Sequence, residues 1–192
     1  GREASVIPWR DVVLCHTHDS VQAARASDGE FLWKVPGGGQ STPVVSDDLL
    51  VLVSSKQKGI FAYDLAKDTE PKERWSVSLS AKRHAASPIA HNGLLYLMGG
   101  GRHFCVSLKD GGTRWSEQVN CELSSPILAD DRLLVLERNG GYLSMVGTDP
   151  TSYQYLGKAR VQVMKAVSPA LANGYIFLRK KDKVACYDLR AK

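Results

Sequence analysis

The sequence predicts an all-β fold made of repeated four-stranded antiparallel units. Three observations support this. Ser-Pro or Thr-Pro dipeptides recur roughly every 40 residues, tight-turn pairs separate short β-branched and aromatic runs, and no segment carries sustained helical periodicity. Four short strands in a repeat of this length are typical of one β-propeller blade. We therefore expect blades arranged radially around a common axis.

Five copies of the pattern cover almost the whole chain. Four of them open with Ser-Pro or Thr-Pro, and a fifth, more degenerate copy begins at Ser5. The predicted units are 5–41, 42–86, 87–124, 125–167 and 168–192. Since they share one architecture, residues 1–192 are predicted to form a single propeller domain or a fragment of one.

Each unit is expected to begin with a short strand, a tight turn and a second strand. The turn pairs are Arg10-Asp11, Asp47-Asp48, Asn92-Gly93, Asp130-Asp131 and Asn173-Gly174. Asn-Gly and Asp-rich pairs adopt the left-handed backbone angles of a tight hairpin. The second strands follow as runs such as LLVLV (49–53), LLYLM (94–98) and YIFLR (175–179), which are rich in strand-forming residues.

A third and a fourth strand complete each unit. The third strands include IFAYDL (60–65), HFCVSL (103–108) and VACYDL (184–189). One position in them is predicted to be small in every unit, because a cysteine there behaves as a small hydrophobe at a tight packing spot. The residues at this position are Ala23, Ala62, Cys105, Ser144 and Cys186. The fourth strand closes the unit at Trp33, Trp75, Trp115 and, weakly, Tyr155.

The segments ASDGEFLW (26–33) and LKDGGTRW (108–115) share one motif that ends in Trp. With the Ser-Pro opening and the Asn-Gly turn, it resembles the pyrroloquinoline-quinone-type, or quinoprotein-like, propeller repeat. The units are most similar to its non-catalytic branch, the bacterial outer-membrane-assembly-type propellers. This resemblance implies that each closing Trp packs between neighbouring blades, where a large aromatic buries about 150–250 Å². It also implies an extracytoplasmic or periplasmic location.

The number of blades predicts an incomplete ring. The fifth unit reaches CYDLRAK (186–192) without a fourth strand or a closing Trp. We expect about four and a half to five blades, within the seven- or eight-bladed ring that the resemblance implies. A small five-bladed ring is the alternative. An open arc would expose strand edges and favour self-association.

An enzymatic role finds little support in the sequence. Quinoprotein dehydrogenases, as the resemblance implies, carry an adjacent cysteine pair, Glu, Asn and Asp ligands for calcium, and an Asp base. The four cysteines, Cys15, Cys105, Cys121 and Cys186, include no adjacent pair, and most acidic residues fall in turns. We therefore expect no catalytic residues, no pyrroloquinoline quinone and no calcium. A fragment of a quinoprotein-type oxidoreductase whose cofactor-binding blades are missing remains the alternative.

Other candidate sites have simpler interpretations. His16 and His18 lie two residues apart without a third ligand nearby, so we expect an exposed turn and no metal site. The glycine-rich runs 36–41 and 99–104 fit no phosphate-binding motif and are predicted to be loops between strands. Trp9 is predicted to line the core or the channel wall. No apolar run approaches the roughly 18–20 residues that span a bilayer.

The charges separate by face once the repeat is assumed. Strands alternate in direction, so loops one-to-two and three-to-four share a face, and loops two-to-three and the links between blades share the other. The first face receives mainly acidic residues: Asp11, Asp28, Glu30, Asp47, Asp48, Asp68, Glu70, Glu73, Asp110, Asp130, Asp131 and Asp149. The second receives mainly basic ones: Lys56, Lys58, Lys82, Arg83, Arg102, Arg138, Arg160, Lys165, Arg179, Lys180, Lys181 and Lys183.

The basic face is the predicted binding surface. Its candidate residues are Lys82, Arg83, Arg102, Lys165, Arg179, Lys180, Lys181 and Lys183. A face of one sign attracts oppositely charged partners, here a protein or polyanion with an acidic surface. Specific nucleic-acid binding is not expected, because these loops lack interleaved aromatic residues for base stacking. The sequence thus predicts a non-catalytic scaffold.

Overall fold

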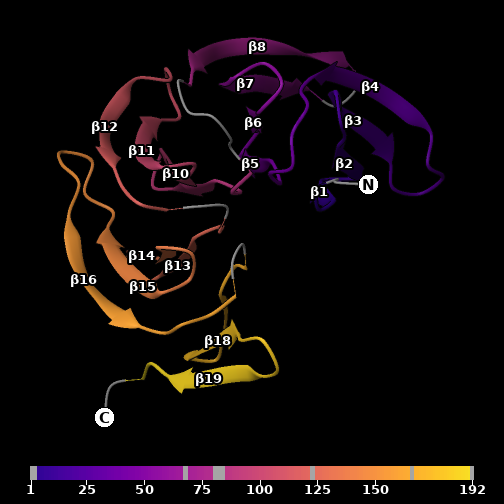
Figure 1. Cartoon of the computed structure of the whole chain (residues 1–192). Coiled ribbons are helices and arrows are strands. Elements are labelled where there is room, and N and C mark those ends of the chain that lie inside the picture. The colour runs from indigo at the N-terminus through magenta and orange to yellow at the C-terminus, as the bar shows by residue number, and fades with distance from the viewer. Residues whose placement is uncertain (1–3, 67–68, 80–84, 122–123, 165–166, 191–192) are drawn as a thin grey trace.

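The computed structural model describes residues 4–66, 69–79, 85–121, 124–164 and 167–190. These residues form 19 strands in five antiparallel sheets and contain no helix. The sheets are arranged radially, each with its first strand nearest the centre and its last strand outside (Figure 1). The predicted all-β propeller class is confirmed.

We number the sheets as blades 1 to 5. Blade 1 contains β1 (Ile7–Trp9), β2 (Val12–His16), β3 (Ser20–Arg25) and β4 (Phe31–Pro36). Blade 2 contains β5 (Val44–Ser46), β6 (Leu49–Ser54), β7 (Gly59–Ala66) and β8 (Thr69–Ser78). Blade 3 contains β9 (Ile89–His91), β10 (Leu94–Gly99), β11 (Arg102–Ser107) and β12 (Thr113–Gln118). Blade 4 contains β13 (Ile127–Ala129), β14 (Arg132–Glu137), β15 (Tyr142–Gly147) and β16 (Tyr155–Arg160). Blade 5 contains β17 (Ala170–Ala172), β18 (Tyr175–Arg179) and β19 (Val184–Asp188).

The first hairpin of every blade turns at the predicted residue pair. The first residue of each pair has a positive φ angle: Arg10 (54°), Asp47 (53°), Asn92 (49°), Asp130 (45°) and Asn173 (51°). Asn and Asp tolerate this left-handed region better than most residues. The turn pairs therefore fix the register of the two innermost strands.

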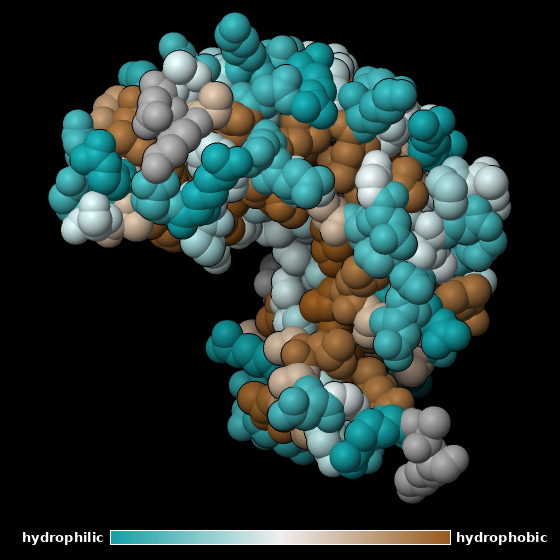
Figure 2. All heavy atoms as spheres, turned by 180° about the vertical axis from the view of Figure 1, so that it is seen from behind, coloured by the Kyte–Doolittle hydropathy of each residue, from teal (hydrophilic) through white to brown (hydrophobic). Residues whose placement is uncertain are grey.

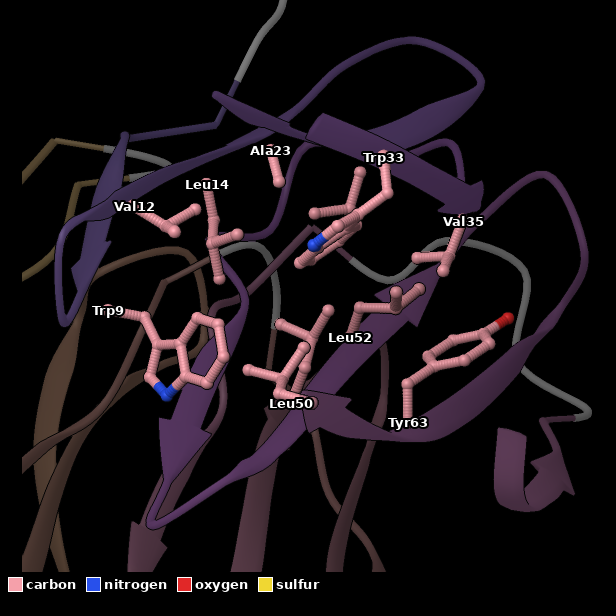
Figure 3. Close-up of a cluster of buried hydrophobic side chains, with 11 residues drawn as sticks. Trp9, Val12, Leu14, Ala23, Trp33, Val35, Leu50, Leu52 and Tyr63 are labelled. Atoms are coloured by element: carbon pink, nitrogen blue, oxygen red, sulfur yellow. The ribbon is translucent and has the colours of Figure 1, made fainter. Parts of the chain in front are cut away.

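The core lies in the joints between successive blades. Val12 and Leu14 of blade 1 share a buried cluster with Leu50 and Leu52 of blade 2, and Trp33 points from β4 toward them (Figure 3). Trp9 belongs to this cluster and is 6% exposed, which agrees with the predicted core role. Three further clusters join blades 2 and 3, 3 and 4, and 4 and 5. Alternate residues of a strand thus face the blade before and the blade after.

The five blades form an open arc (Figures 1 and 2). Blade 1 and blade 5 stand at opposite ends of the arc, so the alternative of a closed five-bladed ring is wrong for the described chain. Blade 5 has three described strands, which leaves β19 as an edge. Seen from behind, apolar side chains follow the joints while polar ones cover the outside (Figure 2). No described helix is long and apolar enough to cross a membrane.

The register of blade 4 corrects two predictions. In blades 1 to 3 the closing Trp pairs with Ala23, Ala62 or Cys105, directly beside a β-bulge. In blade 4 the pair beside the bulge is Met145 with Gly157. The fourth small residue is therefore not Ser144, and the closing position is not Tyr155, which pairs with Val146 and is 49% exposed.

Candidate interaction surface

The turns between second and third strands are bonded to the links between blades, so they share one face. The amide of Lys56 donates to the carbonyl of Gly38 (3.1 Å), and that of Arg138 donates to Asn120 (2.8 Å). In blade 5 the link residue Met164 donates to the carbonyl of Arg179 (3.3 Å). We call this surface the link face. The opposite surface, formed by the other loops, is the hairpin face.

The densest described part of the predicted basic surface is one turn of blade 5. Arg179 ends β18, and the amide of Lys180 donates to the carbonyl of Lys183 at 2.8 Å. Arg179, Lys181 and Lys183 are exposed, whereas Lys180 is half-buried. The turn thus presents several cations to solvent within five residues.

The other predicted cations are distributed differently. Arg102 begins β11, is half-buried and donates to the hydroxyl of Ser116 at 3.1 Å. No described contact joins Arg102 to the turn at 179–183. Lys82, Arg83 and Lys165 lie outside the described residues.

Blade 4 adds a cationic group that the sequence analysis only partly found. The guanidinium of Arg138 lies 5.7 Å from the centre of the Tyr142 ring, and the ammonium of Lys158 lies 4.7 Å from it. Arg160 is the cross-strand partner of Tyr142. Arg138 and Arg160 were assigned to the basic face, but Lys158 was missed. Its alternation with Arg160 along β16 was the available signal.

The two faces differ in how their charges are paired. The Arg–carboxylate ion pairs of the described residues lie on the hairpin face: Arg10–Asp48, Arg25–Asp28, Arg25–Glu30, Arg74–Asp64 and Arg190–Asp188. His91 and Asp131 are hydrogen-bonded there as well, at 2.6 Å. None of the described link-face cations forms an ion pair with another described residue. Each exposed pair stabilises the fold only weakly. On the hairpin face, these pairs place arginines beside many of the acidic side chains and so cancel much of the negative charge. The cations of the link face have no such partners among the described residues.

A buried histidine fixes the link between blades 1 and 2. The Nδ1 of His16 hydrogen-bonds the carbonyl of Ser41 (2.8 Å), and the Gly38 amide donates to Nε2 (3.1 Å). Because Nε2 accepts, Nδ1 carries the proton and the ring is neutral. Burial lowers the pKa of His16 from its usual value. The predicted exposed turn is therefore wrong for His16, which is fully buried, whereas His18 is exposed.

A second buried histidine, His103, lies in the joint between blades 3 and 4. Neither of its ring nitrogens has a hydrogen-bond partner among the described residues, and its ring centre lies 5.8 Å from that of Tyr153. Burial lowers the pKa of His103 to about 4. No group of three or more His, Cys, Asp or Glu side chains among the described residues could hold a metal ion.

Comparison with known proteins places this architecture in a family. The family model of the outer membrane protein assembly factor BamB matches residues 6–191 of this chain. No curated protein matches the sequence. The crystal structure of BamB from Moraxella catarrhalis is similar with a TM-score of 0.73 at 15% identity, and the match covers 96% of this chain and 60% of that one.

Two further structures share the fold. The computationally designed Ika8 protein gives a TM-score of 0.72 at 12% identity, covering 97% of this chain and 58% of that one. The quinohemoprotein alcohol dehydrogenase ADHIIG from Pseudomonas putida HK5 gives 0.72 at 14% identity, covering 100% of this chain and 42% of that one. The chain thus spans at most 60% of the length of these proteins. By its family match and its blades, the chain belongs to the BamB family of PQQ-type propeller repeat proteins.

Proposed function

We propose that this chain is a non-catalytic propeller scaffold that binds an acidic protein segment through its link face. The observation that carries the proposal is the difference in charge pairing between the faces. Cations without ion pairs at Arg179, Lys181 and Lys183 attract an acidic partner, whereas paired charges on the hairpin face cancel locally. The bonded links and turns hold these cations on a fixed frame, which lowers the entropy lost on binding.

The family supports a role in protein interaction. The related protein is named an outer membrane protein assembly factor, and we propose that this chain likewise acts outside the cytoplasm as a binding platform. The link face would supply the electrostatic part of recognition. Such a surface mainly accelerates association and selects partners by charge.

The alternative is that these blades are part of a quinoprotein-type oxidoreductase. The fold shared with the quinohemoprotein alcohol dehydrogenase favours it. Against it, the sequence has no adjacent cysteines, and the fold alone does not determine activity. We propose that the described blades bind neither pyrroloquinoline quinone nor calcium.

A matched pair of charge-reversal variants tests the scaffold proposal. The link-face variant carries Arg179→Glu, Lys181→Glu and Lys183→Glu. The control carries Lys72→Glu, Lys109→Glu and Arg114→Glu, three exposed cations of the hairpin face, and changes the net charge equally. Binding of a fluorescein-labelled deca-glutamate peptide is measured by anisotropy at several salt concentrations.

We expect the link-face variant to bind the peptide at least about tenfold more weakly, because several cations act together. The control should bind about as well as the unmodified protein. Affinity should also fall steeply with salt, since exposed charges are screened within about 8–10 Å at moderate ionic strength. Equal losses in the two variants would show that only net charge matters and would overturn the proposal.

A further inference from the structure

An indole fills each of the first three joints in the same way. Trp33, Trp75 and Trp115 are only 5–8% exposed and pack against the following blade. The Nε1–H of Trp75 donates to the carbonyl of Leu108 (2.9 Å), and that of Trp115 donates to Asp149 (2.8 Å). Trp75 and Trp115 thus bond the turn that follows the third strand of the next blade, whereas the buried Nε1 of Trp33 has no hydrogen-bond partner among the described residues.

The joint between blades 4 and 5 lacks this indole. Gly157 occupies the closing position, and a Cβ atom built on it would meet nothing within 4 Å. Leu189 of blade 5 corresponds in register to Leu108 of blade 3, since both follow the third strand and donate to the first hairpin turn. Leu108 is 7% exposed and Leu189 is 47% exposed. The leucine that an indole covers in one joint is therefore uncovered in the other.

A cavity of about 480 Å³ opens at this joint. Its apolar lining includes Leu134, Leu143, Met145, Leu171 and Leu189. We call it the vacant socket. A volume of this size is typical of sites that enclose a small ligand or an anchoring side chain.

The residues at the base of the socket correspond to residues that are buried in the joint between blades 2 and 3. By register, Leu134, Leu143 and Met145 stand where blade 2 has Val51, Ile60 and Ala62. Those three residues of blade 2 are fully buried in one cluster with Trp75. In blade 4, Leu143 and Met145 are half-buried and Leu134 is 8% exposed, so two of the three positions are more accessible than their counterparts in blade 2.

We propose that the vacant socket binds a tryptophan side chain presented by an extended segment of a partner polypeptide. The three other joints show that this geometry accepts an indole from an extended strand. The carbonyl of Leu189 follows the third strand as that of Leu108 does, and offers an acceptor for Nε1–H. Large aromatic anchors in apolar pockets are typical centres of protein recognition.

The rim carries charges of both signs. Arg132 and Arg190 line the cavity together with Asp130. Arg190 is bonded to Asp188 and Tyr175, whereas Arg132 forms no ion pair with any described residue. An acidic residue near the tryptophan would pair with Arg132. This site lies on the hairpin face and is independent of the proposed link-face function.

A peptide from the protein's own closing strand tests the proposal. KERWSVS, the sequence of residues 72–78, presents Trp in an extended segment with an acidic neighbour. Its binding to the 192-residue chain is measured by titration calorimetry, beside a KERASVS peptide. Signals of the three methionine methyls, labelled with ¹³C, report whether Met145 is contacted.

The matched variants are Leu189→Lys and Leu156→Lys. Both leucines are similarly exposed, at 47% and 46%, but only Leu189 lines the socket. We expect KERWSVS to bind, to shift the Met145 methyl, and to lose at least about tenfold in affinity with Leu189→Lys but not with Leu156→Lys. The alanine peptide should bind at least about tenfold more weakly.

Three results would overturn the proposal. Equal affinity of both peptides would indicate strand addition at the edge of β19 instead of indole capture. Equal effects of the two leucine variants would place binding outside the socket. Absence of binding at millimolar peptide would mean that Met145 and its neighbours leave no room for an indole.

Discussion

The joint between blades 2 and 3 and the joint between blades 4 and 5 solve the same packing problem differently. In the first, Trp75 stacks against Gly111, where an added Cβ would come within 2.8 Å of the ring. In the second, Gly157 leaves that space open, yet Leu136 and Leu178 remain buried. The alternating apolar faces of the strands are therefore enough to align two blades, and the indole adds stability and closure.

The largest test of this comparison is removal of the indole where it is present. Trp75→Ala should destabilise the protein by about 3–5 kcal/mol, because a large buried aromatic and its hydrogen bond to Leu108 are lost. Urea or thermal unfolding measures the change. Tyr155→Ala, at an exposed position of blade 4, serves as the control and should have little effect. A similar loss in both variants would contradict the wedge role of Trp75.

The joint between blades 3 and 4 extends the comparison, because Trp115 and His103 both lie against the ring of Tyr153, with ring centres 5.4 and 5.8 Å away. The pKa of His103 in the folded state, about 4, is below the usual 6.5, so the unfolded state binds the proton more strongly. Stability should therefore fall as the pH falls from about 6.5 to 4, by about 3 kcal/mol in total. His103→Val, which copies Val21 of blade 1 in register, should remove most of this loss.

Unfolding of both proteins at pH 7 and pH 4.5 measures the effect. His16 also has a lowered pKa and remains in the variant, so a residual acid sensitivity is expected. Unchanged acid sensitivity in His103→Val would show that another group controls it.

A smaller effect is expected in the joint without an indole. Met145, the cross-strand partner of Gly157, is half-buried against the cluster between blades 4 and 5, so Met145→Ala should cost about 2 kcal/mol, near the low end for methionine truncation. In the joint between blades 2 and 3 the corresponding residue is Ala62, the cross-strand partner of Trp75. If the variant is as stable as the unmodified protein, Met145 does not compensate for the missing ring.

The smallest expected effect concerns the proposed absence of a cofactor. Addition of pyrroloquinoline quinone with calcium should leave the melting temperature unchanged in every variant, because a ligand raises stability only when it binds the folded state. A rise in melting temperature that requires both additions would favour the oxidoreductase alternative.

The fold was predictable from sequence because the same four-strand pattern occurs five times, so an ambiguous strand in one unit can be assigned from its counterparts in the others. The closing position of blade 4 was not, since a β-bulge between Met145 and Val146 sets it and the repeat has lost its Trp there. Choosing Ser144 instead of Met145 is a one-residue error, and one residue moves a side chain to the opposite face of a strand.

The candidate site was predictable only in part. Sorting loops by strand direction assigned Arg179, Lys181 and Lys183 to one face, because direction alternates whatever the loop sequence. His16 was misplaced because its polar neighbours suggested a turn. Its alternation with Val12 and Leu14, both buried, carries it into the joint. The vacant socket depends on a missing side chain in one blade and the register of the next, so no short motif predicts it.

The arc also determines how the molecule can come apart. Each blade buries its apolar surface only against its immediate neighbours, so cooperativity passes from one joint to the next as in a linear array. Among the described residues, blade 5 packs against blade 4 through the joint without an indole. Native-state hydrogen exchange should therefore find the amides of β18 and β19 opening at lower free energy than those of β10 and β11. The chain would then lose its last blade as a separate cooperative step, while blades 1 to 4 stay folded.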